Sequence, residues 1–424
     1  MLNIFFQKLK FIFLDEGLRK RILFLLTGLV LFTVLRSIPI PGVEAEDLAV
    51  FLESQQFFGL LDIFSGGGLS NFSIVMLGVG PFITASIIMQ LMTVMSPKIK
   101  SLYHEEGDAG KKKFIQYSRL LTIPLALVQS FGFLTLLTRE GVLPQLDPFG
   151  MITSIVVIAA GSILLMWIGE LITQYGIGNG ISLIIFAGIV SSLPGVIAER
   201  IFTFNTSQIP LYLGFLAVVI TVVFGVVLVT EAERPVPVTY AKRVRGEKMR
   251  RGISTYLPLR LNQGGVIPII FALSILLFPQ MIFQFLRNVE SELISSVADS
   301  ILIFLDNGWI YAGLYFILVF GFTFFYVAIT FDPKAISTNL QKGGAFIPGI
   351  RPGNPTTEYI GNIVTRITLV GALFLSVVAV LPLAMRAITG IEALAIGGTA
   401  LLITVVVVTD LIKKIDAQIT LREY

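Results

Sequence analysis

Ten apolar runs divide this chain, and each is long enough to cross a bilayer. They are free or nearly free of charged residues, and Leu, Ile, Val and Phe dominate them. A hydrocarbon core of about 30 Å needs roughly 20 apolar residues in a helix. The runs are apolar all round, whereas porin-type strands would alternate every second residue. We therefore predict an all-α polytopic membrane protein whose ten transmembrane helices lie at about 22–38, 74–95, 117–137, 151–171, 179–196, 211–230, 264–286, 309–331, 363–385 and 394–411.

The basic residues predict how these helices are oriented. Cytoplasmic connections are enriched in Lys and Arg, and acidic residues have little influence on orientation. If the chain starts in the cytoplasm, the opposite side holds only five of the 31 Lys and Arg residues, namely Arg36, Arg139, Arg200, Arg287 and Arg386. Removing one span would mix the two sets. We therefore expect both termini on the cytoplasmic side.

The spans divide into two halves of five. An odd number per half gives the halves opposite topologies, so we expect two pseudo-symmetric halves, as in many inverted-repeat membrane proteins. Charged residues interrupt the start of the chain, which favours a retained amphipathic segment on the membrane surface. The expected parts are the N-terminal segment 1–20, the first half 21–196, an external hinge connection 197–210, the second half 211–412 with cytoplasmic loops at about 231–262 and 332–362, and a cytoplasmic tail 413–424.

The composition argues against several classes of catalytic, cofactor and metal site. Only 14% of the residues are charged, there is no cysteine, and the single histidine, His104, lies in a polar connection. No span has an acidic residue, a lysine or a histidine near its middle, and no phosphate-binding loop occurs. We expect no enzyme activity, no cofactor and no metal site. An ion-coupled secondary transporter stays the alternative, because carriers also bind through backbone carbonyls at broken helices. A structural scaffold is the third possibility.

The connection between the first two spans joins a short apolar stretch to three glycines. An interfacial re-entrant helix and a mobile stopper in a pore mouth both fit this composition. The glycines favour the stopper, because they permit large backbone rotations at small cost. The candidate stopper, at about 57–72, comprises Phe57, Leu60, Leu61, Ile63, Phe64, Gly66, Gly67 and Gly68.

Two local patterns lie near the expected middle of the first half. Pro81 and its small neighbours predict a kinked, closely packed second span. The glycine-rich run 176–180 predicts a tight turn between spans four and five, because no strand precedes it as a dinucleotide loop requires. Val79 and Ile83 share one helix face, and Ile181 and Ile185 repeat the spacing. Alone, such pairs are typical of ordinary packing.

The two long cytoplasmic loops are candidates for partner binding. The first is rich in Lys and Arg, which neutralise phosphates and acidic surfaces, although basic residues are expected on this side in any case. The second, around 343–353, is apolar and rich in turn residues for an exposed connection. The candidate partner-binding residues are Arg243, Arg245, Arg250, Arg251, Lys342 and Arg351.

Several segments closely resemble those of the bacterial SecY family, the channel subunit of the Sec translocon. They are residues 39–42, 166–170 with 176–180, 346–353 and 397–399, and the similarity runs through all ten spans. The resemblance implies a gated channel in the bacterial plasma membrane. Such a channel passes unfolded secretory polypeptides and releases hydrophobic segments sideways into lipid. It also implies that the candidate stopper is the plug of the channel.

The resemblance also implies roles for individual residues. A ring of aliphatic side chains forms the constriction, which dewets and so blocks ions and water. The matching positions are Val79, Ile83, Ile181, Ile185, Ile270 and Ile403. The lateral gate matches Thr84, Gln129 and Asn262, whose mutual hydrogen bonds would hold it shut. The implied partners are SecE and SecG subunits, the SecA ATPase, the ribosome with its RNA, signal sequences, translocating polypeptides and membrane lipid, with Arg351 the best candidate for a partner contact.

Overall fold

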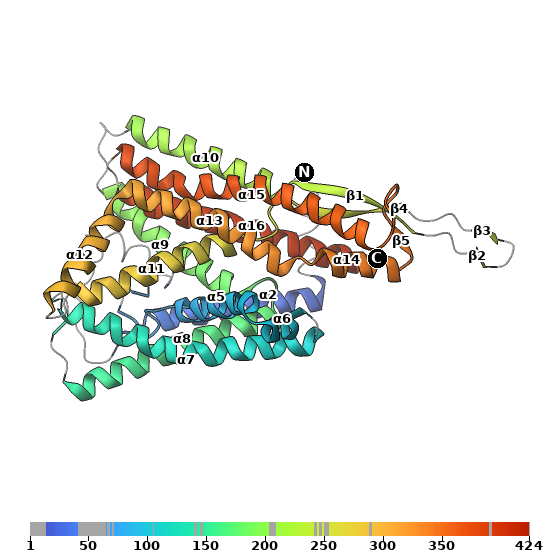
Figure 1. The fold of residues 1–424 in the computed structure, drawn as a ribbon. Coiled ribbons are helices and arrows are strands. Elements are labelled where there is room, and N and C mark those ends of the chain that lie inside the picture. The colour runs from blue at the N-terminus through green and yellow to red at the C-terminus, as the bar shows by residue number, and fades with distance from the viewer. Residues whose placement is uncertain are drawn as a thin grey trace.

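The computed structural model is a bundle of long helices with a small sheet projecting from one end (Figure 1). The structure describes residues 14–40, 65, 68–69, 72–104, 106–139, 141, 143–144, 147–202, 209–240, 244–245, 248–249, 254–287, 291–389 and 392–423.

Each predicted span overlaps a long helix in the described part of the chain. These helices are α2 (Glu16–Arg36), α5 (Gly80–Met95), α7 (Gly107–Arg139), α8 (Pro148–Tyr175), α9 (Gly180–Phe202), α10 (Ile209–Glu231), α11 (Ile267–Arg287), α13 (Gly308–Thr330), α15 (Asn354–Thr389) and α16 (Glu392–Glu423). Length and apolarity alone qualify α7, α8, α11, α13 and α15 to cross a membrane. The prediction of an all-α, multi-pass membrane protein is confirmed, and the described strands β1 to β5 lie at one end of the bundle.

The first helix differs from its prediction. Helix α2 begins at Glu16, so residues 16–20 are its first turns and not a separate surface segment. Asp15 caps this start by accepting a hydrogen bond from the backbone N–H of Leu18 at 2.6 Å. Glu16 and Lys20 pair across one turn at 2.8 Å. The charged residues that interrupt the apolar run therefore stabilise the helix start. Residues 1–13 lie outside the described part.

The second span also differs, because Pro81 does not kink it. Residues 74–79 form turns, and α5 begins at Gly80 with Pro81 in its first turn. A proline is tolerated there because its missing N–H would have no helical partner in any case. A sharp bend of 111° follows at the other end, between α5 and the short helix α6 (Pro97–His104).

Two further short helices were not predicted. Helix α14 (Pro333–Lys342) lies at the sheet end of the bundle, and α12 (Glu292–Asp306) crosses the opposite end (Figure 1). Helix α12 packs against α11 and α13 and buries Ala298. It connects two spans without extending either of them.

The two long loops at the sheet end share a three-stranded sheet that the sequence did not predict. Strand β1 (Glu233–Tyr240) pairs antiparallel with β4 (Ser254–Arg260) on one edge and with β5 (Ala345–Phe346) on the other. The short strands β2 (Val244–Arg245) and β3 (Lys248–Met249) pair farther along the hairpin. Val236 and Leu259 share a buried hydrophobic cluster with Ile360 of α15, so the sheet adjoins the end of the bundle.

The two ends of the described chain meet at this same end of the bundle. Leu18 of α2 and Ile419 of α16 pack with Ile177 from the α8–α9 connection. Lys413 of α16 donates to the carbonyl of Thr230 at 2.7 Å, beside the start of the sheet. The distribution of basic residues predicted that both chain ends lie on the same side as the two long loops, and the described ends do so. That this side is cytoplasmic stays a prediction.

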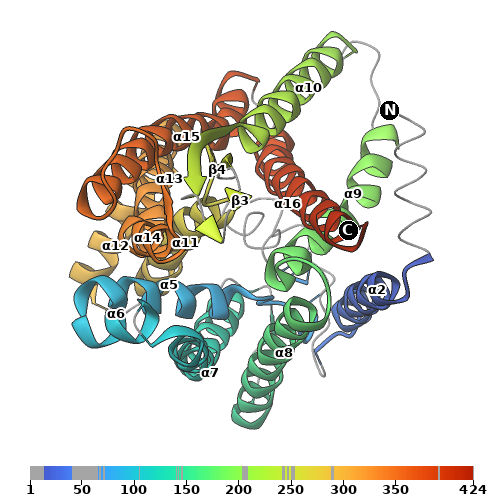
Figure 2. The ribbon, with the colours of Figure 1, turned by 90° about the vertical axis from the view of Figure 1, so that its right-hand side faces the viewer.

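Viewed from the sheet end, the helices of the two predicted halves surround a common centre (Figure 2). The first half, α2 to α9, is blue to green, and the second half, α10 to α16, is yellow-green to red. Helix α11 packs against α5 and α7, and α16 packs against α9. One large hydrophobic cluster fills the space between the halves.

Candidate functional site

The six residues predicted for the pore ring lie in that central cluster. Val79 caps α5, and the others belong to α5, α9, α11 and α16. All except Ile181 are at most 5% exposed, and Ile181 is partly buried against the cluster. The structure therefore brings together side chains that lie more than 300 residues apart at the extremes of the sequence. Their role as a constriction stays a prediction.

The predicted plug lies mostly outside the described residues. The plug candidates outside the described residues are Phe57, Leu60, Leu61, Ile63, Phe64, Gly66 and Gly67. Gly68 is described, and its carbonyl accepts hydrogen bonds from the backbone and hydroxyl of Ser73 at 3.0 and 3.1 Å. A Cβ at Gly68 would meet the carbonyl oxygen of Val75 at 3.0 Å. In this structure Gly68 therefore lies closely packed in a hydrogen-bonded turn, and the hinge expected from the three glycines stays a prediction.

The chain on either side of the predicted plug is pinned together. The Ile40 N–H donates to Phe72 O, and the Ile74 N–H donates to Ile38 O, both at 3.0 Å. Leu69 and Phe72 are at most 1% exposed and belong to the cluster that holds the six ring candidates. The described end of the segment is therefore buried in the same hydrophobic cluster as the ring candidates.

The three residues of the predicted lateral gate lie on elements that meet. Thr84 is on α5, Gln129 is on α7, and Asn262 precedes α11. Their hydrogen bonds are local: Thr84 donates to Gly80 O at 3.1 Å, and Asn262 accepts from the Gly265 N–H at 2.9 Å. Among the described residues no hydrogen bond joins the three side chains. The expected mutual hydrogen bonds are absent because a helical threonine bonds its own preceding turn, and Asn262 closes the turn before α11.

The α8–α9 turn positions the start of α9, which carries Ile181 and Ile185. Asn179 accepts from the N–H groups of Ile181 and Ser182 at 3.1 and 3.4 Å and so caps the helix. A Cβ at Gly180 would lie 1.9 Å from the carbonyl oxygen of Gly169, so the two helices touch backbone to backbone. The predicted tight turn is confirmed, and the contact leaves Ile181 covering Gly169.

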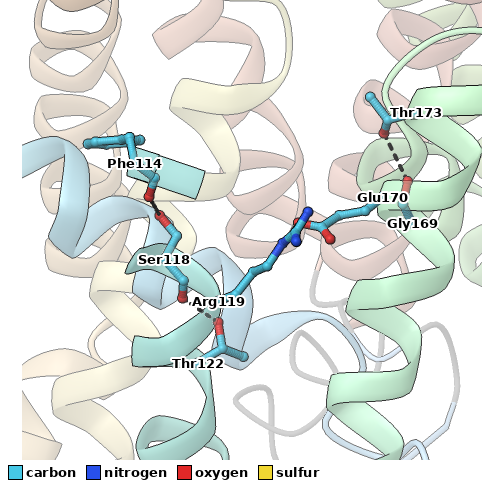
Figure 3. A network of polar contacts seen from close by, with 7 residues as sticks. All are labelled: Phe114, Ser118, Arg119, Thr122, Gly169, Glu170 and Thr173. Atoms are coloured by element: carbon cyan, nitrogen blue, oxygen red, sulfur yellow. Dashed lines mark hydrogen bonds and ion pairs between the residues drawn. The ribbon is translucent and has the colours of Figure 1, made fainter. Parts of the chain in front are cut away.

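An ion pair joins α7 to α8 beside this turn (Figure 3). Arg119 Nε lies 2.7 Å from Glu170 Oε1, with the Arg119 side chain 46% exposed and the Glu170 side chain 17% exposed. Thr173, one turn after Gly169, donates to the Gly169 carbonyl and accepts from the Gly180 N–H, both at 2.8 Å. Glu170 therefore connects a helix of the predicted gate to the helix corner that positions Ile181.

We predict that Arg119 and Glu170 couple measurably in a double-mutant cycle. Arg119→Gln, Glu170→Gln and the double variant should show a coupling of roughly 0.5–1 kcal/mol, because solvent screens the half-exposed arginine. Thermal unfolding of the purified protein in lipid nanodiscs measures it. Lys113 and Glu106 provide the matched cycle, since they lie 3.4 Å apart and are both about half exposed. A coupling no larger than theirs would contradict the prediction.

A polar cavity of about 270 Å³ lies between the sheet and the central cluster. Asn179, Asn262, Gln263, Asp410, Lys413 and Lys414 contribute its polar lining. Lys414 pairs with Asp410 at 2.6 Å, and Lys413 pairs with Glu231 at 3.3 Å. Val407 and Ile267 also line the cavity, each within one helical turn of the ring candidates Ile403 and Ile270. The cavity therefore leads from the sheet end toward the aliphatic cluster.

The predicted partner-binding residues that the structure describes lie on or near the sheet. Lys342 and Arg351 are exposed, Arg245 belongs to β2, and Arg243, Arg250 and Arg251 lie outside the described residues. The loop that carries Arg351 is fixed by buried Ile347 and by hydrogen bonds from Ser337 to Gly353 O and from Thr356 to Arg351 O. Within the described chain no acidic side chain pairs with Arg351. Its guanidinium group is therefore presented to solvent on an ordered loop.

Comparison with known proteins decides the family. Residues 73–412 match the SecY family. This chain belongs to the SecY family. Protein translocase subunit SecY of Corynebacterium glutamicum is 40% identical, with 97% of each chain covered. That of Mycobacterium tuberculosis is 39% identical over 100% of this chain and 99% of the relative. That of Thermus thermophilus is 41% identical over 96% of this chain and 94% of the relative.

Solved channel structures share the SecY fold seen here. A structure of a protein-conducting channel gives a TM-score of 0.67 at 19% identity, covering 96% of this chain and 93% of that one. A SecY structure concerned with the plug domain and the closed state gives 0.68 at 20% identity and the same coverage. Sec61 in a canine ribosome–channel complex gives 0.60 at 19% identity, again with the same coverage. These likenesses support the fold described above over 96% of the chain.

Proposed function

We propose that this SecY family member is the channel subunit of a bacterial protein translocase and conducts unfolded polypeptides across the membrane. The observation that carries the proposal is that the six ring candidates, from the start of α5 and from α5, α9, α11 and α16, all lie in or against one buried aliphatic cluster between the two halves. An uncharged aliphatic constriction excludes water and ions, and its flexible side chains deform around a passing chain without binding it.

The polar cavity above this cluster is the entrance for the polypeptide in this proposal. Its amides and paired charges keep an unfolded segment hydrated, and its floor lies one helical turn from Ile270 and Ile403. Leu69 and Phe72 pack into the same cluster and support a role of segment 57–72 as the plug. The contact of α11 with α5 and α7 is the place where hydrophobic segments leave sideways into lipid.

The partners follow from the same proposal. SecE and SecG complete the complex, and the SecA ATPase or a translating ribosome supplies the energy. They dock on the sheet end, where Lys342 and Arg351 are exposed and where the basic hairpin projects (Figure 1). Basic side chains on such loops attract acidic protein surfaces and ribosomal RNA. In this proposal the sheet and both chain ends are cytoplasmic, and the bundle lies in the bacterial plasma membrane.

A secondary transporter agrees less well with the same geometry. Such a carrier needs polar or charged groups at mid-membrane to bind its substrate and coupling ion. The predicted ring positions instead carry only Val and Ile, and the nearby ion pairs lie on the sheet side of them. Membership of the SecY family, whose curated relatives are protein translocase subunits, points the same way.

Cross-linking of a stalled secretory chain tests the channel function. A photo-reactive amino acid replaces Ile83, Ile185, Ile270 or Ile403 in turn, in the chain assembled with its translocase partners. We expect each position to cross-link a secretory polypeptide arrested during transport. Ile220 of α10 is the control position, because it is 59% exposed on the outer surface of the bundle. Cross-links at Ile220 but at none of the four ring positions would rule out a central pathway.

A further inference from the structure

A short apolar groove lies on the outer surface of the bundle, at the end away from the sheet. It runs between the first turns of α13 and the last part of α15 and has a volume of about 270 Å³. Gly308, Trp309, Ala312 and Gly313 form one wall, and Val380 and Ala384 belong to the other. Gly308 and Ala312, Trp309 and Gly313, and Val380 and Ala384 are each four positions apart, so the two residues of each pair lie on one helix face.

The groove is hollow because two of its wall residues are glycines, which have no side chain. A Cβ built at Gly308 or Gly313 meets nothing within 4 Å, so both glycines face open space. Helices α13 and α15 otherwise pack extensively against each other. Glycine costs about 0.5–1 kcal/mol relative to alanine inside a helix. The two glycines thus keep a space open that larger side chains would fill.

The neighbouring surface is the part of the protein that faces the membrane. Trp309 at the rim is 69% exposed, and tryptophan concentrates where the hydrocarbon meets the headgroups. Ile317, just beyond the groove on α13, is 66% exposed. The groove therefore starts at the level of the headgroups and continues toward the middle of the bilayer.

Helix α12 marks the same level independently. It lies across the end of the bundle next to the start of α13 (Figure 1). Leu293, Val297 and Phe304 are 82%, 57% and 51% exposed and share one face, while Ala298 is buried. Asp299 Oδ1 forms an ion pair with Arg287 Nε of α11 at 2.9 Å. An apolar face on a helix that lies along a membrane boundary inserts among lipid headgroups and acyl chains.

We propose that this groove binds one acyl chain of a phospholipid from the leaflet away from the sheet. The proposal rests only on the multi-pass membrane fold and not on protein conduction. Every named wall residue is apolar, which suits a hydrocarbon chain and offers nothing to a charged ligand. Trp309 then lies beside the ester and headgroup region of the bound lipid, where its indole N–H has polar partners.

The length of the groove favours a lipid chain over a helix of a partner protein. The wall on α13 extends from Gly308 to Phe316, which at 1.5 Å per residue is about 12 Å. One leaflet of a ~30 Å hydrocarbon core is about 15 Å deep, so an acyl chain fits this extent. A transmembrane partner helix would need a contact stripe along the full thickness.

Native mass spectrometry of the translocase complex tests lipid binding. The delipidated complex is titrated with dioleoyl phosphatidylglycerol, for the wild type and for Gly313→Leu. We expect the tightest lipid to bind about ten-fold more weakly in the variant, because the new side chain displaces roughly two methylene groups from the groove. Gly132→Leu in α7 is the matched control, since its Cβ also meets nothing within 4 Å. Equal loss in both variants would overturn the proposal.

A second variant and a cross-link complete the test. Ala384→Leu fills the groove from the α15 side and should weaken binding of the same lipid. A folding defect in one of the two variants therefore does not decide the outcome. Benzoylphenylalanine in place of Phe316, irradiated in intact membranes, should form an adduct with the mass of one phospholipid. Ala384→Leu should lower the yield of this adduct. A protein-sized adduct would assign the groove to a partner helix and refute the lipid. Protein export is measured in parallel, because the outcome of the lipid-binding test neither supports nor contradicts the proposed protein conduction.

Discussion

Membranes that contain the Ile83→Asn, Ile185→Asn and Ile270→Asn triple variant are expected to leak ions. The three side chains are at most 5% exposed within the central cluster and come from three different helices. Amide side chains would hydrate the constriction and remove the dewetting that blocks small solutes. Conductance across a planar bilayer with the reconstituted complex measures the effect, which should rise from background to discrete channel openings. Unchanged conductance would argue against these residues as the seal.

The triple variant needs a control for folding, because truncating a buried isoleucine costs roughly 2–5 kcal/mol. Leucine at the same three positions conserves volume and apolarity and should cost less than about 1.5 kcal/mol each. The leucine protein is therefore expected to stay sealed. If it leaks as much as the asparagine protein, loss of packing and not loss of hydrophobicity is the cause. Protease protection of the inserted chain shows whether both proteins reach the membrane intact.

Export driven by the motor ATPase is expected to fail in an Arg351→Glu variant that still inserts into the membrane. Arg351 is exposed on an ordered loop, so the substitution changes folding stability by no more than about 0.5 kcal/mol. Losing a charge pair across an interface costs at least about 2 kcal/mol, or roughly 30-fold in affinity. Transport of a secretory protein into inverted vesicles with purified SecA gives the measurement.

Lys334→Glu supplies the matched control for this charge reversal. Lys334 is exposed on α14 within the same connection, and its backbone N–H is held by Asp332 at 2.9 Å. Export should stay close to the wild-type level in this variant, because the change in net charge is identical and only its position differs. Equal loss of export in the two variants would show that the general charge of the loop matters and that Arg351 has no specific contact.

The sequence was most informative where burial in lipid dictates the pattern. All ten apolar runs overlap helices, because a lipid-embedded backbone has to satisfy its own hydrogen bonds. The glycine-rich run at 176–180 was predicted to be a tight turn because no strand precedes it, and the structure adds that a Cβ at Gly180 would collide with the backbone of Gly169. The ring candidates needed the family resemblance, because aliphatic pairs at helical spacing occur in any core.

Features outside the expected spans escaped the sequence argument. Strand β1 contains Pro235 and Pro237, which usually argue against a central strand. Both lie where β1 pairs only with β4, and β5 joins beyond them at Thr239 and Tyr240. The β1–β5 pairing is also long-range, so no local pattern announces it. The start of α2 was misplaced for the opposite reason, because local charges there cap and pair within a helix.

The shared sheet has a mechanical consequence. Strand β1 continues from α10, β4 leads into α11, and β5 lies between α14 and α15, while β1 holds the other two strands. A load applied at Arg351 or at the hairpin therefore reaches α10, α11 and α15 together. Any partner that pushes on this end tilts much of the second half as a single lever, with α5 and α7 as the surface against which α11 moves.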